Sequence, residues 1–213
     1  KGLGVDAVWL MPIMKAKSKH GYDIIDYYKV EPDYGTMKDF EHLVKSAHKK
    51  GIKIILDHVL NHCSGYNDWL DRAVLRDPKY VDYFVWKDRF DIELLYGGWG
   101  ELDDGRSILG SFSCADLNYR SVKLRTEIKN MTKFWIDKGV DGFRLDAARH
   151  IDDSDERNTD LWWQEFNEYC KSINPDIYIV GENWYDTNAE IAPCFADYDS
   201  SFKFPFMDEL VRL

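Results

Sequence analysis

The chain has 213 residues, of which 45% are hydrophobic and 31% charged, so it can bury a substantial core and is not disordered by composition. Its formal net charge of -10, from 28 basic and 38 acidic residues, argues against a nucleic-acid or anionic-membrane surface, because both bind clustered positive charge. No apolar run approaches the roughly 20 residues of a membrane span. The four cysteines form no CxxC pair, which argues against a zinc site and a disulfide framework.

Short apolar runs recur along the chain and predict β-strands. We expect strands over residues 7–11, 52–57, 142–146, 177–181 and 201–204. The first four are mostly apolar, as is typical of parallel strands that helices cover. Helices are predicted between them, and this alternation of strand, helix and strand is typical of right-handed βαβ units.

Three predicted helices carry apolar residues at helical spacing. The first follows Thr36, which with Asp39 forms a capping arrangement, and it ends at Gly51. The second is predicted over 121–138 and the third over 161–173.

Residues 63–117 do not fit this alternation and are predicted to be an insertion. The stretch is long, aromatic and rich in glycine, and a long insertion between a strand and its helix usually carries function, as a lid or a substrate wall. The alternative is a mobile surface excursion. Four aromatic side chains, Trp69, Phe84, Trp86 and Trp99, favour a packed structure.

Charged or imidazole side chains stand at the ends of three predicted strands. Asp57 ends the second strand, with Asn61 and His62 just beyond it; Asp146 ends the third, and Glu182 follows the fourth. The carboxyl ends of parallel barrel strands meet at one cleft, so these side chains are candidates for a common site. Asp146 and Glu182 are the first candidates for a glycosidase carboxylate pair.

Each of the two acids has a functional and a structural interpretation. Arg144 lies two residues before Asp146, so it shares one face of a strand with this acid, whose pKa it would lower as a carboxylate nucleophile requires. A structural salt bridge is the alternative. Glu182 lies beside Gly181 and near Trp184, where a partly dry pocket would let it donate a proton to a glycosidic oxygen. An N-cap or a surface acid is the alternative.

The cluster around the second strand end supports further interpretations. Asn61 can supply a carbonyl oxygen to calcium, and His62 can bond sugar hydroxyls. A metal-dependent barrel hydrolase that uses Asp57, His58 and His62 is the alternative.

Five segments, taken together and in order, resemble the α-amylase family of glycoside hydrolases. They are 57–62 (DHVLNH), 142–150 (GFRLDAARH), 181–184 (GENW), 20–27 (HGYDIIDY, with YGT at 34–36) and 114–118 (CADLN). In the last of these, Ala115 stands where the family usually has proline. The resemblance spans nearly the whole chain.

The resemblance implies roles for single residues. Asp146 matches the nucleophile and Glu182 the general acid/base of a retaining mechanism, whose two carboxyls lie about 5–5.5 Å apart. Arg144 matches the arginine beside the nucleophile. The other matches are sugar-binding positions (Tyr22, which stacks under the sugar, His62, Asp57, Arg149 and His150) and calcium-ligand positions (Asn61, Asp116 and the carbonyl of His150).

The resemblance also implies the fold. It is a partial (β/α)8 TIM barrel with about strands 2 to 6, formed by residues 1–62 and 118–213, with a domain B-like insertion at 63–117 after strand 3. The family's third catalytic acid then lies outside these 213 residues, and we expect the 213 residues alone to be inactive and poorly stable.

The residues after Asp146 predict the substrate. The run of 147–150 (AARH) resembles the α-amylase pattern, in which a basic residue and His contact glucose on the leaving-group side. Hydrolysis of α-1,4 linkages in starch or maltooligosaccharides is therefore the first expectation. The alternatives are α-glucosidase or transglycosylase action, or a non-catalytic barrel relative that serves as an interaction scaffold. Calcium is the one cofactor that the resemblance implies, no organic cofactor is expected, and the cellular location is not predicted.

Overall fold

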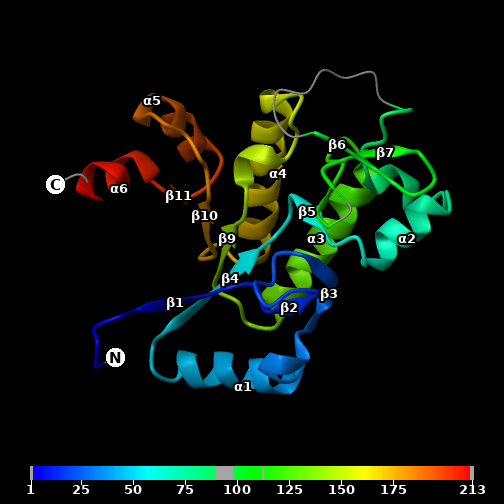
Figure 1. Ribbon diagram of the computed structural model, residues 1–213. Coiled ribbons are helices and arrows are strands. Elements are labelled where there is room, and N and C mark those ends of the chain that lie inside the picture. Colours follow the sequence, from blue (N-terminus) through cyan, green and yellow to red (C-terminus); the bar gives the residue numbers. More distant parts are fainter. Residues whose placement is uncertain (1, 90–97, 112, 212–213) are drawn as a thin grey trace.

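The structure is a computed structural model that describes residues 2–89, 98–111 and 113–211. Five strands form its main sheet in the order β1 (Ala7–Leu10), β4 (Lys53–His58), β9 (Gly142–Leu145), β10 (Tyr178–Gly181) and β11 (Ser200–Ser201). Every neighbouring pair is parallel, and the strands follow one another in chain order (Figure 1). A sheet wound in one direction only is a barrel arrangement, because the order of a doubly wound sheet reverses at a switch point.

The sheet is curved, as a barrel wall must be. Trp9 of β1 and Phe202, which directly follows β11, meet edge to face with ring centres 5.9 Å apart. Their strands are the two outermost of the sheet, and a flat sheet would hold such strands about 19 Å apart, with side chains standing perpendicular to it. The contact therefore requires curvature, and the predicted partial barrel is confirmed.

Helices connect the strands in the predicted alternation. α1 (Met37–His48) precedes β4, α3 (Val122–Asp137) precedes β9, α4 (Glu156–Ile173) precedes β10, α5 (Asn188–Ile191) and the 3-10 helix η4 (Ala192–Ala196) precede β11, and α6 (Phe204–Val211) follows it. Phe40 of α1 packs edge to face on Trp135 of α3 at 5.3 Å, so these two helices share the core. Within the described ranges, no helix is long and apolar enough to cross a lipid bilayer.

The helix caps show which boundaries local sequence could reveal. The cap of α1 is confirmed, because Thr36 and Asp39 each accept the other's backbone N–H. The predicted start of α4 at residue 161 is wrong. The helix already begins at Glu156, because the Asp155 side chain accepts two N–H groups of its first turn.

Two features of the strands differ from the prediction. The strand predicted over 201–204 ends at Ser201, because Phe204 already begins α6. The segment after β1 folds into an antiparallel hairpin that was not predicted. Its strands are β2 (Met14–Ala16) and β3 (Ile24–Val30), and the 3-10 helix η1 (Pro32–Tyr34) follows β3. A second 3-10 helix, η3 (Ala148–His150), follows β9.

The described part of the insertion has buried side chains of its own. This packing favours a folded substrate wall over a mobile surface segment. Its elements are β5 (His62–Cys63), α2 (Asp68–Val74), η2 (Val81–Tyr83), β6 (Trp99–Glu101), β7 (Ser107–Leu109) and β8 (Ala115–Asp116). Trp86 is fully buried, and the guanidinium groups of Arg76 and Arg106 lie 5.0 and 4.9 Å from its ring centre. Residues 90–97 and 112 lie outside the described residues, and the domain boundaries at 63 and 117 stay a prediction.

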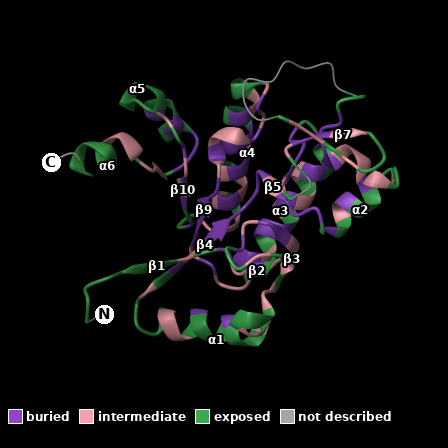
Figure 2. Ribbon diagram, viewed as in Figure 1, coloured by how far each residue is buried: buried purple, intermediate pink, exposed green. Residues whose placement is uncertain are grey.

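Burial is highest in the middle of the sheet (Figure 2). All residues of β9 are buried, whereas Val8 and Trp9 of the edge strand β1 are 38% and 43% exposed. A polar side chain on β9 is therefore removed from water and needs partners in the protein.

Gly142, the first residue of β9, has no room for a larger side chain. A Cβ there would lie 2.5 Å from the backbone oxygen of Tyr178 in β10, and a paired backbone cannot move aside as a flexible side chain can. We expect Gly142→Ala to lower the free energy of unfolding by about 1–3 kcal/mol, the usual cost of overpacking. Denaturant unfolding measures the loss. Gly98→Ala is the control, because a Cβ at Gly98 meets no described atom within 4 Å, and equal stability of the two variants would contradict the packing.

Candidate active site

Arg144 of β9 is the centre of a group of carboxylates at the strand ends. Its Nη1 donates to Oδ1 and Oδ2 of Asp57 at 2.9 and 3.1 Å and to Oδ1 of Asp146 at 2.6 Å. Its Nη2 forms an ion pair with Oε1 of Glu182. The arginine side chain is only 4% exposed, so it and three carboxylates meet in a place that water barely reaches.

Strand pairing brings these residues together. Asp57 of β4 lies directly opposite Arg144 of β9 in the parallel register. Asp146 directly follows β9 and its N–H still donates to the His58 carbonyl at 3.2 Å, so it keeps the alternation of the strand and shares a face with Arg144 two residues before it. The backbone N–H of Glu182 donates to the Leu145 carbonyl at 2.9 Å, so the pairing of β9 with β10 continues up to this acid.

The turn after Asp146 also holds Glu182. Ala147 donates its N–H to Oε2 of Glu182 at 3.3 Å, and Ala148 donates its N–H to the Glu182 carbonyl at 3.1 Å. Ala147 has a left-handed backbone, with φ 45° and ψ 41°, which costs a residue other than glycine about 1 kcal/mol or more. The strained turn thus aims a backbone donor at a carboxylate of the site.

Burial dominates the protonation of this group. It raises the pKa of Asp57 to about 7, against the lowering effect of Arg144 and with a further rise from Asp146. Burial also raises the pKa of Asp146, although Arg144 lowers it. Arg144 lowers the pKa of Asp146, as predicted, but burial outweighs this contribution, so the net shift is upward.

Tyr22 and His62 border the same group, as predicted for two sugar-binding residues. The Tyr22 hydroxyl donates to Oδ2 of Asp57 at 3.2 Å. The Tyr22 backbone carbonyl lies 3.1 Å from Nε2 of His62, and because a carbonyl only accepts, Nε2 carries a proton.

Arg149 contacts the loop after Glu182, and His150 contacts Asp153. Arg149 donates from Nη1 to the Trp184 carbonyl at 2.8 Å, and its guanidinium lies 4.6 Å from the centre of the Tyr185 ring. Nδ1 of His150 is hydrogen-bonded to Oδ1 of Asp153 at 2.8 Å. Arg149 therefore borders the loop that follows the last of the three carboxylates, whereas His150 borders the pocket described next.

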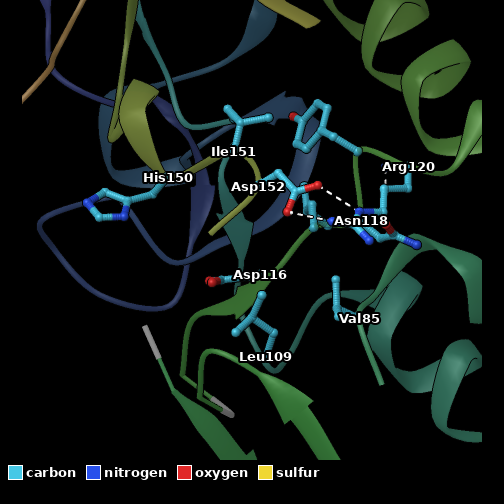
Figure 3. A pocket seen from close by; sticks show the side chains of 10 residues that line it. Val85, Leu109, Asp116, Asn118, Arg120, His150, Ile151 and Asp152 are labelled. Atoms are coloured by element: carbon cyan, nitrogen blue, oxygen red, sulfur yellow. Dashed lines mark hydrogen bonds and ion pairs between the residues drawn. The ribbon is translucent and has the colours of Figure 1, made fainter. Parts of the chain in front are cut away.

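The predicted calcium ligands adjoin one another. Nδ2 of Asn61 is hydrogen-bonded to the backbone carbonyl of His150. Asp116 of β8 and His150 line one cavity of about 10 Å³, which is room for one water-sized group (Figure 3). Burial and the neighbouring Asp153 raise the pKa of Asp116 to about 7.

These residues fit a calcium ion in their chemistry, because all three supply oxygen. The amide of Asn61 lies between His62 and His150, with Oδ1 at 2.9 Å from Nδ1 of His62. A neutral His62 with its proton on Nε2 can only accept a hydrogen bond at Nδ1. The Asn61 amide must then be rotated so that its NH₂ group, and not Oδ1, faces this nitrogen. That rotation points Oδ1 of Asn61 at the His150 carbonyl, and two facing oxygens suit a cation. Calcium binding itself stays a prediction.

The alternative metal site of Asp57, His58 and His62 is wrong. His58 points away from Asp57, because neighbouring residues of a strand face opposite sides. Its ring is fully buried, stacks on Phe143 at 4.5 Å and is hydrogen-bonded through Nε2 to Thr132 at 3.0 Å. Across the described chain, no group of three or more His, Cys, Asp or Glu side chains is arranged to hold a metal ion.

Two aromatic residues that the sequence did not single out also border Arg144. The ring centres of Trp9 and Phe202 lie 5.2 and 5.6 Å from its Cζ. The predicted strand over 7–11 shows which residues share a face with Trp9, but it does not show whether that face points into the barrel. Phe202 lay in the strand predicted over 201–204, but the strand ends at Ser201, so the predicted alternation does not place its side chain.

Known proteins resemble this chain over its whole length. A family model described as "Alpha amylase, catalytic domain" matches residues 1–212. The chain is 46% identical over 214 residues to Alpha-amylase 3 of Dictyoglomus thermophilum, a match that covers 100% of this chain and 42% of that protein. It is 39% identical over 212 residues to an alpha-glucosidase of Culex pipiens, with 86% and 35% covered.

A solved structure agrees. The alpha-amylase from H. orenii superposes with a TM-score of 0.88 at 35% identity, over 99% of this chain and 44% of that one. The chain therefore spans less than half the length of these relatives. With a family model matched over residues 1–212 and a curved parallel sheet like that of a solved relative, the chain belongs to the alpha-amylase family of catalytic domains.

Proposed function

We propose that the protein containing this chain is a retaining glycoside hydrolase that cleaves α-1,4 linkages of starch or maltooligosaccharides. The observation that carries the proposal is the contact of one guanidinium, that of Arg144, with both Asp146 and Glu182. Family membership supports it, and so do the names of two relatives, an α-amylase and an α-glucosidase. Because the chain spans less than half of these relatives, the proposal concerns the whole protein.

In the proposed reaction Asp146 attacks the anomeric carbon while Glu182 gives its proton to the departing glycosidic oxygen. Glu182 then takes a proton from water, which attacks the anomeric carbon and releases Asp146, so the configuration is retained. This mechanism needs the two carboxyls about 5–5.5 Å apart. Two carboxylates bound to the two terminal nitrogens of one guanidinium, as here, can reach that separation.

The residues around the pair have supporting roles in this proposal. Arg144 bonds Oδ1 of Asp146 at 2.6 Å, which orients the carboxylate and leaves Oδ2 to attack. Tyr22 offers an aromatic face to the sugar. Both ring nitrogens of His62 have partners in the protein, so a sugar hydroxyl would have to replace the Tyr22 carbonyl at Nε2. A calcium ion at Asn61, Asp116 and His150 would join the barrel to the insertion and supply charge stabilisation there.

A second candidate function is α-glucosidase or transglycosylase action, and the name of the Culex pipiens relative favours the former. These reactions share the covalent intermediate and differ in chain-length preference or in the acceptor, which is water or a sugar hydroxyl. A non-catalytic scaffold has less support, because Arg144, Asp146 and Glu182 are all present and in contact.

Removal of either carboxylate tests the proposal. We expect Glu182→Gln and Asp146→Asn each to lower kcat on a maltooligosaccharide by about 10²–10⁴-fold, because one transfers protons and the other forms a covalent bond. Reducing-sugar release measures the rate, and NMR of fresh product should show the α anomer. Asp33→Asn, at an exposed acid, should keep full activity. Near-normal turnover by Glu182→Gln, or a β product, would overturn the proposal.

Asp57 should make stability depend on pH. Its pKa is about 7 in the folded protein and about 4 in an unfolded chain, so between these values the folded state holds the extra proton. The contribution of Asp57 to the free energy of unfolding is therefore highest below about pH 4 and falls as the pH rises to about 7. Denaturant unfolding between these pH values should show a flatter fall for Asp57→Asn. The same slope in Asp57→Asn and in Asp33→Asn would contradict this expectation.

Arg149 is expected to bind the sugar on the leaving-group side of the cleft. Loss of its charged hydrogen bonds in Arg149→Ala should raise KM for maltooligosaccharides by about 10-fold and change which bond is cut, with a smaller effect on kcat. Chromatography of the products from end-labelled maltooligosaccharides reads out the cleavage pattern. If the pattern stays the same, Arg149 has no part in substrate binding.

A further inference from the structure

A buried hydrogen-bond network anchors the loop that follows Glu182. Asn183, only 2% exposed, donates from Nδ2 to the hydroxyl of Tyr198 and to Oγ of Ser201, the latter at 3.1 Å. The network thus ties the loop after β10 to Tyr198, which follows η4, and to Ser201 of β11.

The ring of Tyr198 contacts the residue on the other side of the acid. A Cβ at Gly181 would lie 2.4 Å from both Cζ and the hydroxyl oxygen of Tyr198, so only glycine leaves room for this phenol. The ring itself is fixed, because it is 4% exposed and packs edge to face on Trp163 at 6.2 Å. Tyr198 therefore contacts both chain neighbours of Glu182, Gly181 through its ring and Asn183 through its hydroxyl.

We propose that Tyr198 is a positioning residue for Glu182 and acts through its hydrogen bond with Asn183. The inference rests on the proposed function, in which Glu182 is the general acid/base. A group that transfers a proton must be held within about 0.5 Å of its productive place by locked supporting residues. Ala147 supports Glu182 from the turn after β9, and the Tyr198 hydroxyl supports the opposite side of the loop.

The competing interpretation is that Tyr198 only fills space in the core. Tyr198→Phe separates the two, because it keeps the ring against Gly181 and Trp163 and removes only the hydroxyl that accepts from Asn183. A packing role predicts unchanged catalysis by the folded variant. A positioning role predicts a defect that appears only when the reaction needs the proton of Glu182.

The experiment compares two substrates in the same protein. A maltooligosaccharide has a sugar leaving group that must be protonated, whereas α-maltosyl fluoride releases fluoride without a proton from the enzyme. We expect Tyr198→Phe to lower kcat/KM about 10-fold or more for the maltooligosaccharide, through kcat and not KM, and less than about 2-fold for the fluoride. A defect of equal size on both substrates, or none on either, would overturn the inference.

Two controls fix the interpretation. Tyr28→Phe removes another hydroxyl bonded to a side chain, that of Glu127 at 2.8 Å, and should leave both rates unchanged. In a double-mutant cycle, Tyr198→Phe should cost nothing more once Asn183→Ala is present, and additive losses would overturn the route through Asn183. Thermal unfolding of each variant corrects the rates for the folded fraction.

Glu182→Gln, measured in parallel, separates this inference from the proposed function. If Glu182→Gln loses maltooligosaccharide turnover but Tyr198→Phe behaves like Tyr28→Phe, only the positioning role fails. If Glu182→Gln keeps normal turnover, the proposed function fails, and the positioning role fails with it.

Discussion

The buried ion pairing of Arg144 is the interaction on which the rest of the site depends. A guanidinium that is 4% exposed is stable only with partners, and here Asp57, Asp146 and Glu182 supply them from three neighbouring strand ends. The dependence is mutual. Without the arginine, three buried carboxylates would face one another with no cation to offset their charges. Their shared cation therefore decides where the three acids lie.

The backbone around this group is as constrained as the side chains. Ala147 occupies a left-handed conformation in which its N–H reaches Glu182, and Gly181 leaves the space that the Tyr198 ring fills. Both features lie within one residue of an acid at a strand end. Strain and close contacts of this kind persist only where the surrounding structure determines them fully. The sheet provides that support, because all neighbouring strands of it are paired in register.

The junction between the insertion and the barrel lies beside the candidate active site. The short ladder of β5 with β8 places His62 opposite Asp116. His62, a predicted sugar-binding residue, and Asp116, a predicted calcium ligand, thus lie on one pair of strands. Asn61 contacts both the ring of His62 and the backbone carbonyl of His150. His62 also contacts the carbonyl of Tyr22, whose hydroxyl donates to Asp57, so a chain of hydrogen bonds links β5 to the carboxylates.

The sequence by itself determined the main parallel strands, most of the helices between them and the acids at the strand ends. Alternating apolar runs, the Thr36 cap and the spacing of Arg144 and Asp146 depend on hydrogen bonds and side-chain directions within a few residues, so they can be read locally. Tertiary structure alone decided the rest. That His58 faces Phe143 while Asp57 faces Arg144 depends on which side of the sheet is interior. The raised pKa of Asp57 and Asp146 and the contact of Asn183 with Tyr198 depend on strand register and on loss of water, and both exist only once residues distant in the chain have packed together.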